Sequence, residues 1–107
     1  MPRELYGLHG TIRARPGQRD GLLAILLEAA SNAPAMPGCR LYLVSLVPGD
    51  ADAIAVTEIW DDKVSHDASL SLERVREIIG RAKPLIAGMG ASSEFHPVGG
   101  LGLGDAR

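Results

Sequence analysis

Residues 39–60 read CRLYLVSLVPGDADAIAVTEIW, two apolar runs on either side of Pro48-Gly49-Asp50. The first run, Cys39 to Val47, carries Leu, Val and Tyr at both parities, which is typical of a strand covered on both faces. The second run, Ala53 to Trp60, alternates and places Ile54, Val56, Glu58 and Trp60 on one side. We predict two strands joined by a hairpin, the first of them central or doubly buried.

The segment before this hairpin predicts a strand followed by a helix. From Leu5 to Ala14 apolar residues recur at alternate positions, a period typical of a strand. Pro16-Gly17 ends this alternation, and apolar residues then follow at the i, i+3, i+4 spacing of an amphipathic helix, over about residues 18–32.

The segment after the hairpin predicts two helices. Asp61 or Asp62 can cap a short helix that runs through Leu70, because an Asp side chain accepts from the free N–H groups of the first turn. Ser71 can cap a second helix that stops at Pro84. The apolar side of this second helix is expected to contain Leu72, Val75, Ile79 and Ala82.

The last predicted element is a weak strand at the edge of the sheet. Gly88 and Gly90 indicate the return of the chain, and residues 92–98 follow as a strand in which Pro97 cannot donate a ladder hydrogen bond. The remaining residues, 99–107, form a Gly-rich tail that is either flexible or wrapped around a partner.

The order strand, helix, strand, strand, helix, strand defines an α+β, ferredoxin-like split βαβ fold. We expect one domain over residues 1–107, with its core at about 5–98 and helices on one sheet face only. The opposite face carries apolar residues, and exposed apolar area of this extent marks an interface. We therefore predict a homodimer formed by sheet-to-sheet packing.

Composition excludes several classes of function. The chain has 107 residues with a net charge of −2 and a pI of about 5.8, so it lacks the basic surface that nucleic acid or anionic lipid requires. No apolar run approaches a membrane span of roughly 18 residues. The single Cys39, an N-terminus without a signal peptide and scattered histidines indicate a cytoplasmic protein with no disulfide and no metal site.

Few residues are candidates for chemistry. Trp60 lies where a strand passes into a helix, so it is either a pocket wall or a core indole, and Val56 and Glu58 share its side. His66 is either at the lip of that pocket or faces solvent, and its neighbour Asp67 points elsewhere on a helix, which predicts no His-Asp pair. His9 faces either the pocket or the dimer interface.

These patterns together resemble a known family. Gly10-x-Ile12-x-Ala14 with Arg15-Pro16-Gly17, then Pro37-Gly38-Cys39-x-x-Tyr42, then Thr57-Glu58-x-Trp60-Asp61 resembles the antibiotic biosynthesis monooxygenase (ABM) family. The continuation, with His66-Asp67-Ala68-Ser69-Leu70 and Ala82-Lys83-Pro84-Leu85-Ile86, is similar to its quinol monooxygenase branch. The resemblance covers roughly residues 5–98.

The resemblance implies a dimeric α/β barrel with a cavity between the helices and sheet of each subunit. Such relatives oxidise quinols or anthrones, small aromatic substrates, with dioxygen as co-substrate and without flavin, haem or metal. Trp60 matches their strand-end Trp, His66 stands where they carry a Tyr, and Val56 replaces their Asn, which removes a polar contact to substrate.

The residues then take distinct roles. His66 and Trp60 are the predicted catalytic residues, and Trp60, Val56, Glu58 and His9 the predicted substrate-binding residues. The ordinary pKa of an imidazole lies closer to that of a phenol than a carboxyl pKa does, so His66 is a better base than Glu58. The indole of Trp60 is expected to stack on the substrate ring and present its N–H to an oxygen.

Two other functions remain open from the sequence. Haem-degrading enzymes of this fold also use a Trp and a His, so a haem-binding or haem-degrading protein is one alternative, which a Soret shift with hemin would reveal. A non-catalytic dimer that binds an aromatic metabolite is the other, because one fold hosts unrelated functions.

Overall fold

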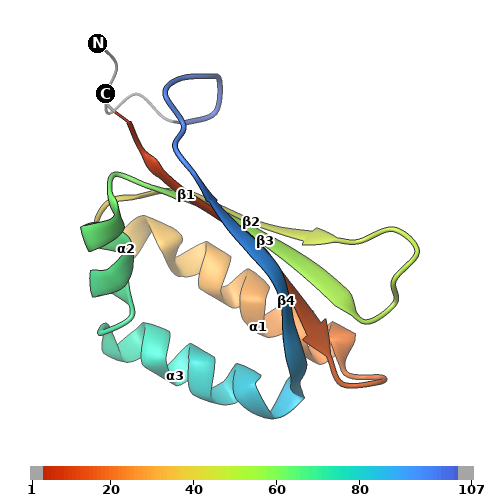
Figure 1. The fold of residues 1–107 in the computed structure, drawn as a ribbon. Helices are drawn as coiled ribbons and strands as arrows, with labels where there is room; N and C mark the ends of the chain where they lie inside the picture. Colours follow the sequence, from red (N-terminus) through yellow and green to blue (C-terminus); the bar gives the residue numbers. More distant parts are fainter. Residues whose placement is uncertain (1–3, 104–107) are drawn as a thin grey trace.

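The computed structural model describes residues 4–103. Its elements are β1 (Tyr6–Ala14), α1 (Arg19–Asn32), η1 (Ala33–Ala35), β2 (Cys39–Leu46), β3 (Ala53–Trp60), α2 (Lys63–Ser69), α3 (Glu73–Ala82), η2 (Lys83–Leu85) and β4 (Ile86–Phe95). The strands form one antiparallel sheet in the order β2-β3-β1-β4, and the helices cover one of its faces (Figure 1). The predicted α+β ferredoxin-like fold is confirmed.

Strand register decides which side chains face the helices. Tyr6 of β1 lies opposite Trp60 of β3, and Ile12 lies opposite Ile54. Since side chains alternate along a strand, the even-numbered residues of both strands point toward the helices. There Leu22 and Ile54 are fully buried in the main core cluster.

Two strand predictions are corrected by the sheet. β2 is an edge strand, not a central one, and several of its apolar side chains point to the open face, where Leu43 is 52% exposed. β4 begins at Ile86, not at residue 92, and Gly88 and Gly90 are strand residues. A Cβ on Gly90 would lie 3.2 Å from Thr11, so this glycine allows close approach to β1 rather than marking a loop.

One helix cap is confirmed and the other is wrong. Asp62 Oδ1 accepts a hydrogen bond from Ser65 N at 2.8 Å and caps α2. The cap position of α3 is Leu72, without a side-chain hydrogen bond, so Ser71 does not cap it. Leu72 and Ile79, which were expected on the apolar side of this helix, are 37% and 40% exposed. Ile79 lines a cavity that α3 faces.

A glycine turn fixes the position of α2. Gly38 adopts a φ of +84°, and a Cβ there would lie 2.7 Å from Ser65 of α2. Its carbonyl accepts from Asp61 N at 2.8 Å, at the end of β3. Only glycine permits both the left-handed backbone and this contact, so the Pro37-Gly38 turn holds α2 against the sheet.

The described part of the tail packs on the open face of the sheet. Leu103 is buried against Leu5 and Ile59, and Arg40 Nη1 donates to its carbonyl at 3.4 Å. The tail was predicted to be flexible or to wrap around a partner. Leu103 instead covers one end of the sheet of its own chain. Residues 104–107 lie outside the described residues. None of the helices in residues 4–103 is long and apolar enough to cross a membrane.

Candidate active site

A cavity of about 680 Å³ lies between the helices and the sheet. Its walls come from the helix-facing side of the sheet, from α1 and η1, and from α2 and α3. Most lining side chains are apolar, and the polar ones are Asn32, Tyr42, Glu58, His66, Arg74 and Lys83. An apolar pocket of this size with a few polar groups is typical of a small-molecule site.

Trp60 and His66 meet at one end of this cavity. The Trp60 indole is 1% exposed, and its ring centroid lies 5.6 Å from that of His66 in an edge-to-face arrangement. Tyr6 contacts the imidazole from another direction, with centroids 5.7 Å apart. The predicted pairing of indole and imidazole in one pocket is therefore present.

The Trp60 N–H is already engaged. Trp60 Nε1 donates to Glu58 Oε1 at 3.0 Å, so the expectation that this N–H is presented to a substrate oxygen is corrected. The indole instead forms a wall and orients both Glu58 and His66. Its role in the geometry is one of positioning.

His66 is paired with its sequence neighbour, contrary to prediction. His66 Nδ1 lies 2.9 Å from Asp67 Oδ1. The hydrogen bond from Lys63 is the largest cause that lowers the pKa of Asp67 below its usual value, and the hydrogen bond from His66 is the next. An ionised carboxylate can only accept, so in the neutral imidazole Nδ1 carries the proton and Nε2 is an acceptor, without a hydrogen-bond partner within residues 4–103.

Tyr42 belongs to the site and was missed from the sequence. It lies opposite Glu58 in the register of β2 and β3, and it lines the cavity. Burial, and then the charge of Glu58, raise the pKa of Tyr42 above its usual value, so the hydroxyl stays protonated. Within residues 4–103 this hydroxyl has no hydrogen-bond partner, which leaves a donor for a ligand.

Tyr6 supports the site from β1. Its hydroxyl donates to Glu94 Oε2 at 2.7 Å. Burial, and then this hydrogen bond, raise the pKa of Tyr6 to about 12. Alternation along β1 places Tyr6 on the helix side, and that parity was the available signal for its contact with His66.

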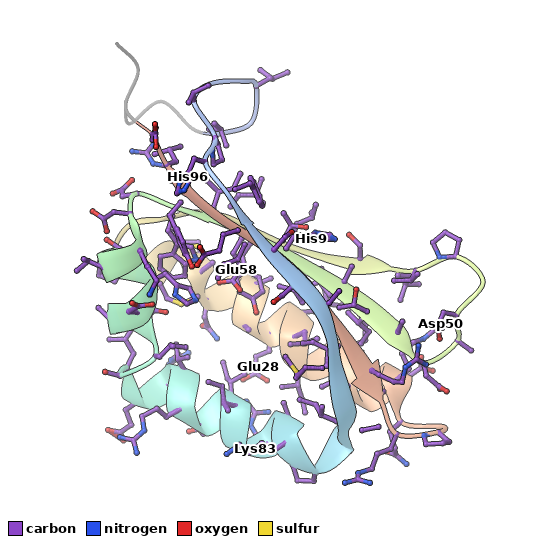
Figure 2. All side chains as sticks on the ribbon, in the orientation of Figure 1. His9, Glu28, Asp50, Glu58, Lys83 and His96 are labelled. Carbon is purple, nitrogen blue, oxygen red and sulfur yellow. The ribbon has the colours of Figure 1, made fainter. Side chains whose placement is uncertain are left out.

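Two predicted site residues lie outside the cavity lining. Val56 is 8% exposed in the core cluster beside Leu26 and Ile54. His9 points away from the helices, and its Nδ1 lies 2.8 Å from Thr57 Oγ1 (Figure 2). The structure thus brings Trp60, Glu58 and His66 together. His9 lies on the opposite face of the sheet, which is the face predicted to form the dimer interface.

Metal and thiol chemistry find little support in the described part of the chain. In residues 4–103 no group of His, Cys, Asp or Glu is arranged to hold a metal ion. Burial, and then the charge of Glu58, raise the pKa of the Cys39 thiol to about 11. The thiol is therefore mostly neutral at physiological pH.

We expect Cys39 to be alkylated slowly by iodoacetamide at pH 8, because about 10⁻³ of a thiol with a pKa near 11 is thiolate at that pH. The rate is expected to be at least about tenfold below that of the urea-unfolded protein and to rise as the pH approaches 11. Mass spectrometry of timed samples measures it. Equal rates in folded and unfolded protein would contradict the burial of this thiol.

Fold and cavity define a class, a small ferredoxin-like α+β protein with a helix-covered pocket for an apolar ligand. The model of the antibiotic biosynthesis monooxygenase family matches residues 5–81. The chain belongs to this family, which confirms the resemblance seen in its sequence.

Solved structures agree with this assignment. A Chloroflexus aurantiacus J-10-fl protein, provisionally named an antibiotic biosynthesis monooxygenase, is 53% identical, with a TM-score of 0.87 over 94% of this chain and 99% of that chain. A similarly named Deinococcus radiodurans protein is 25% identical, with a TM-score of 0.76 over 90% and 95%. A Bacteroides thetaiotaomicron VPI-5482 protein described as a possible oxidoreductase shares the fold at 16% identity, with a TM-score of 0.77 over 88% and 98%. A comparison with curated proteins gave no match.

Proposed function

We propose that this protein is a monooxygenase that oxidises a quinol or anthrone-type aromatic with dioxygen and without a resident cofactor. The observation that carries the proposal is an imidazole in an apolar cavity, held by Asp67 through Nδ1 so that Nε2 is free to take a proton. Membership of the ABM family supports the same reaction class.

The chemistry begins with binding and deprotonation. The substrate ring lies against the Trp60 end of the cavity, and the free Tyr42 hydroxyl donates to a hydroxyl or carbonyl oxygen attached to this ring. His66 Nε2 accepts a proton from the substrate, and the nearby Asp67 carboxylate stabilises the imidazolium. Asp67 is half exposed, so the proton can pass on to solvent.

Oxygen then acts on the electron-rich anion. For an anthrone, the carbanion formed by loss of one CH₂ proton gives its electrons to dioxygen, and a C–O bond forms. Return of a proton gives a hydroperoxide, which loses water as its O–O bond breaks and leaves a quinone carbonyl. Anthrone and dioxygen thus yield anthraquinone and water, and the protein contributes orientation and proton transfer.

Oxygen uptake tests the proposal. We expect the protein to accelerate uptake with at least one member of a panel of quinols and anthrones, including menadiol, above the rate with heat-inactivated protein. Stimulation must scale with protein concentration. Uptake equal to the heat-inactivated control across the panel would overturn the proposed activity.

We also propose that two copies pair through the open faces of their sheets. Leu43 is 52% exposed there, and neither α1, α2 nor α3 covers this face (Figure 1). A charge at Leu43 would have to be desolvated on pairing, which costs several kcal/mol.

We expect light scattering after size-exclusion chromatography to give twice the chain mass for the wild type and the single mass for Leu43→Asp. Val64→Asp, at a residue 77% exposed on the helix side, is the matched control and stays dimeric. A monomeric wild type would contradict this arrangement.

A further inference from the structure

The chemistry of the cavity lining changes along α3. α3 lines it from Arg74 and Val75 at one end to Ala82 at the other, and Lys83 follows. Eight helical steps from Val75 to Lys83 correspond to about 12 Å. Trp60 and His66 stand at the Val75 end, whereas Lys83 lies at the far end of α3 (Figure 2).

The middle of the cavity is apolar. Leu26 of α1, Ile78 of α3 and Ile12 of β1 line it. The far end reaches solvent at Lys83, which lines the cavity and is exposed. A cavity of about 680 Å³ falls within the range of roughly 300–1,000 Å³ that holds drug-sized ligands. One aromatic ring at the Trp60 end would leave most of the length unfilled.

Lys83 is the cation that has no partner at this cavity. Arg74, the other cation among the described lining residues, donates to Asn32 Oδ1 at 2.9 Å. Arg81 of α3 is paired with Glu28. Within residues 4–103 no hydrogen bond or ion pair engages the Lys83 side chain. The only carboxylate among the described lining residues is Glu58, at the opposite end.

The turn that carries Lys83 is fixed to the sheet. Arg15 follows β1 directly, and its backbone N donates to Leu85 O at 2.9 Å. Its Nε donates to Pro84 O, also at 2.9 Å. Both contacts hold η2 at the end of β1, so the base of the lysine side chain has a set position at the cavity mouth.

We propose that the ligand is an elongated aromatic acid, with its phenolic end at His66 and a carboxylate at Lys83. The orientation of the phenol rests on the proposed function, and the length and the charge at the far end are new. The aliphatic stem of Lys83 extends the apolar wall, and its ammonium group meets an acid that leaves the cavity. The lysine sets specificity and takes no part in proton transfer.

Isothermal titration calorimetry with two rod-shaped phenols tests this proposal without requiring turnover. One ligand is 4′-hydroxybiphenyl-4-carboxylate and the other its neutral carboxamide, both titrated in low salt. We expect the wild type to bind the carboxylate about five- to tenfold more tightly, as a partly solvated ion pair allows. Lys83→Gln should bind both ligands equally.

Matched variants separate this site from general electrostatics. Arg76 lies exposed on α3, outside the described cavity lining, and Arg76→Gln removes one positive charge from the same helix. This variant should keep the wild-type preference. Lys83→Glu should prefer the 4′-hydroxybiphenyl-4-methylammonium ligand over the carboxylate, a gain that a misfolded protein could not produce.

Equal binding of carboxylate and carboxamide by the wild type would overturn the inference, as would failure to bind either. A preference that Arg76→Gln abolishes as fully as Lys83→Gln would also overturn it. None of these outcomes touches the oxygen-uptake experiment with quinols and anthrones, so failure of this inference and failure of the proposed reaction are distinguishable.

Discussion

His66→Ala is expected to lower kcat for oxygen-dependent turnover by about 10²- to 10⁴-fold, the contribution of a positioned general base. The imidazole is held by Asp67 on one side and by the rings of Trp60 and Tyr6 on others. No other imidazole in residues 4–103 lines the cavity. Oxygen uptake at saturating substrate measures the change in kcat.

A chemical rescue separates proton transfer from structure. Added imidazole can enter the space left by His66→Ala and should restore part of the rate. The control is His96→Ala, because His96 is exposed and its Nδ1 lies 3.2 Å from the Leu5 carbonyl oxygen; this variant should keep the wild-type rate. A His66→Ala protein that retains at least a third of wild-type kcat would refute the role of this base.

Trp60→Phe is expected to reduce turnover several-fold and to lower the free energy of unfolding by about 1.5–3 kcal/mol, the range for a hydrogen bond to a charged group. The substitution keeps an aromatic wall but removes the Nε1–H that donates to Glu58. Glu58 is then free to reorient in the cavity, and the His66 ring loses part of its support. Urea unfolding followed by far-UV circular dichroism measures stability.

A double variant isolates the hydrogen bond. If the Trp60–Glu58 contact accounts for the loss, Trp60→Phe combined with Glu58→Leu, which removes the acceptor, should cost less stability than the two single changes added together. Strict additivity, together with unchanged turnover in Trp60→Phe, would show that the indole is only a core residue.

The fold was largely predictable because local signals agreed with one another. β3 has the predicted bounds, since its alternation is flanked by a Gly-containing turn and by the Asp62 cap. β2 was harder to place, because apolar residues at both parities fit a strand buried on both faces and also an edge strand whose outer face is apolar. In β4, glycines required by close approach to β1 resembled the glycines of a loop.

The site was only partly predictable, because its contacts depend on side-chain geometry. Trp60 and His66 were identified from the transition between strand and helix. The pairing of His66 with Asp67 was missed, since consecutive residues of a helix point about 100° apart, yet in the short α2 the two side chains bend toward each other. Tyr42 was missed because apolar residues on both faces of β2 gave no signal for which face lines the cavity.

Isotope labelling tests the central claim most directly, that the cavity directs dioxygen onto the carbon that has lost a proton, the former CH₂ carbon of an anthrone. With anthrone and ¹⁸O₂ in unlabelled water, one labelled atom is expected in the new quinone carbonyl and the other in water. Mass spectrometry of product from a short reaction shows the label. Protein-dependent oxidation that gives a quinone without ¹⁸O would contradict the account.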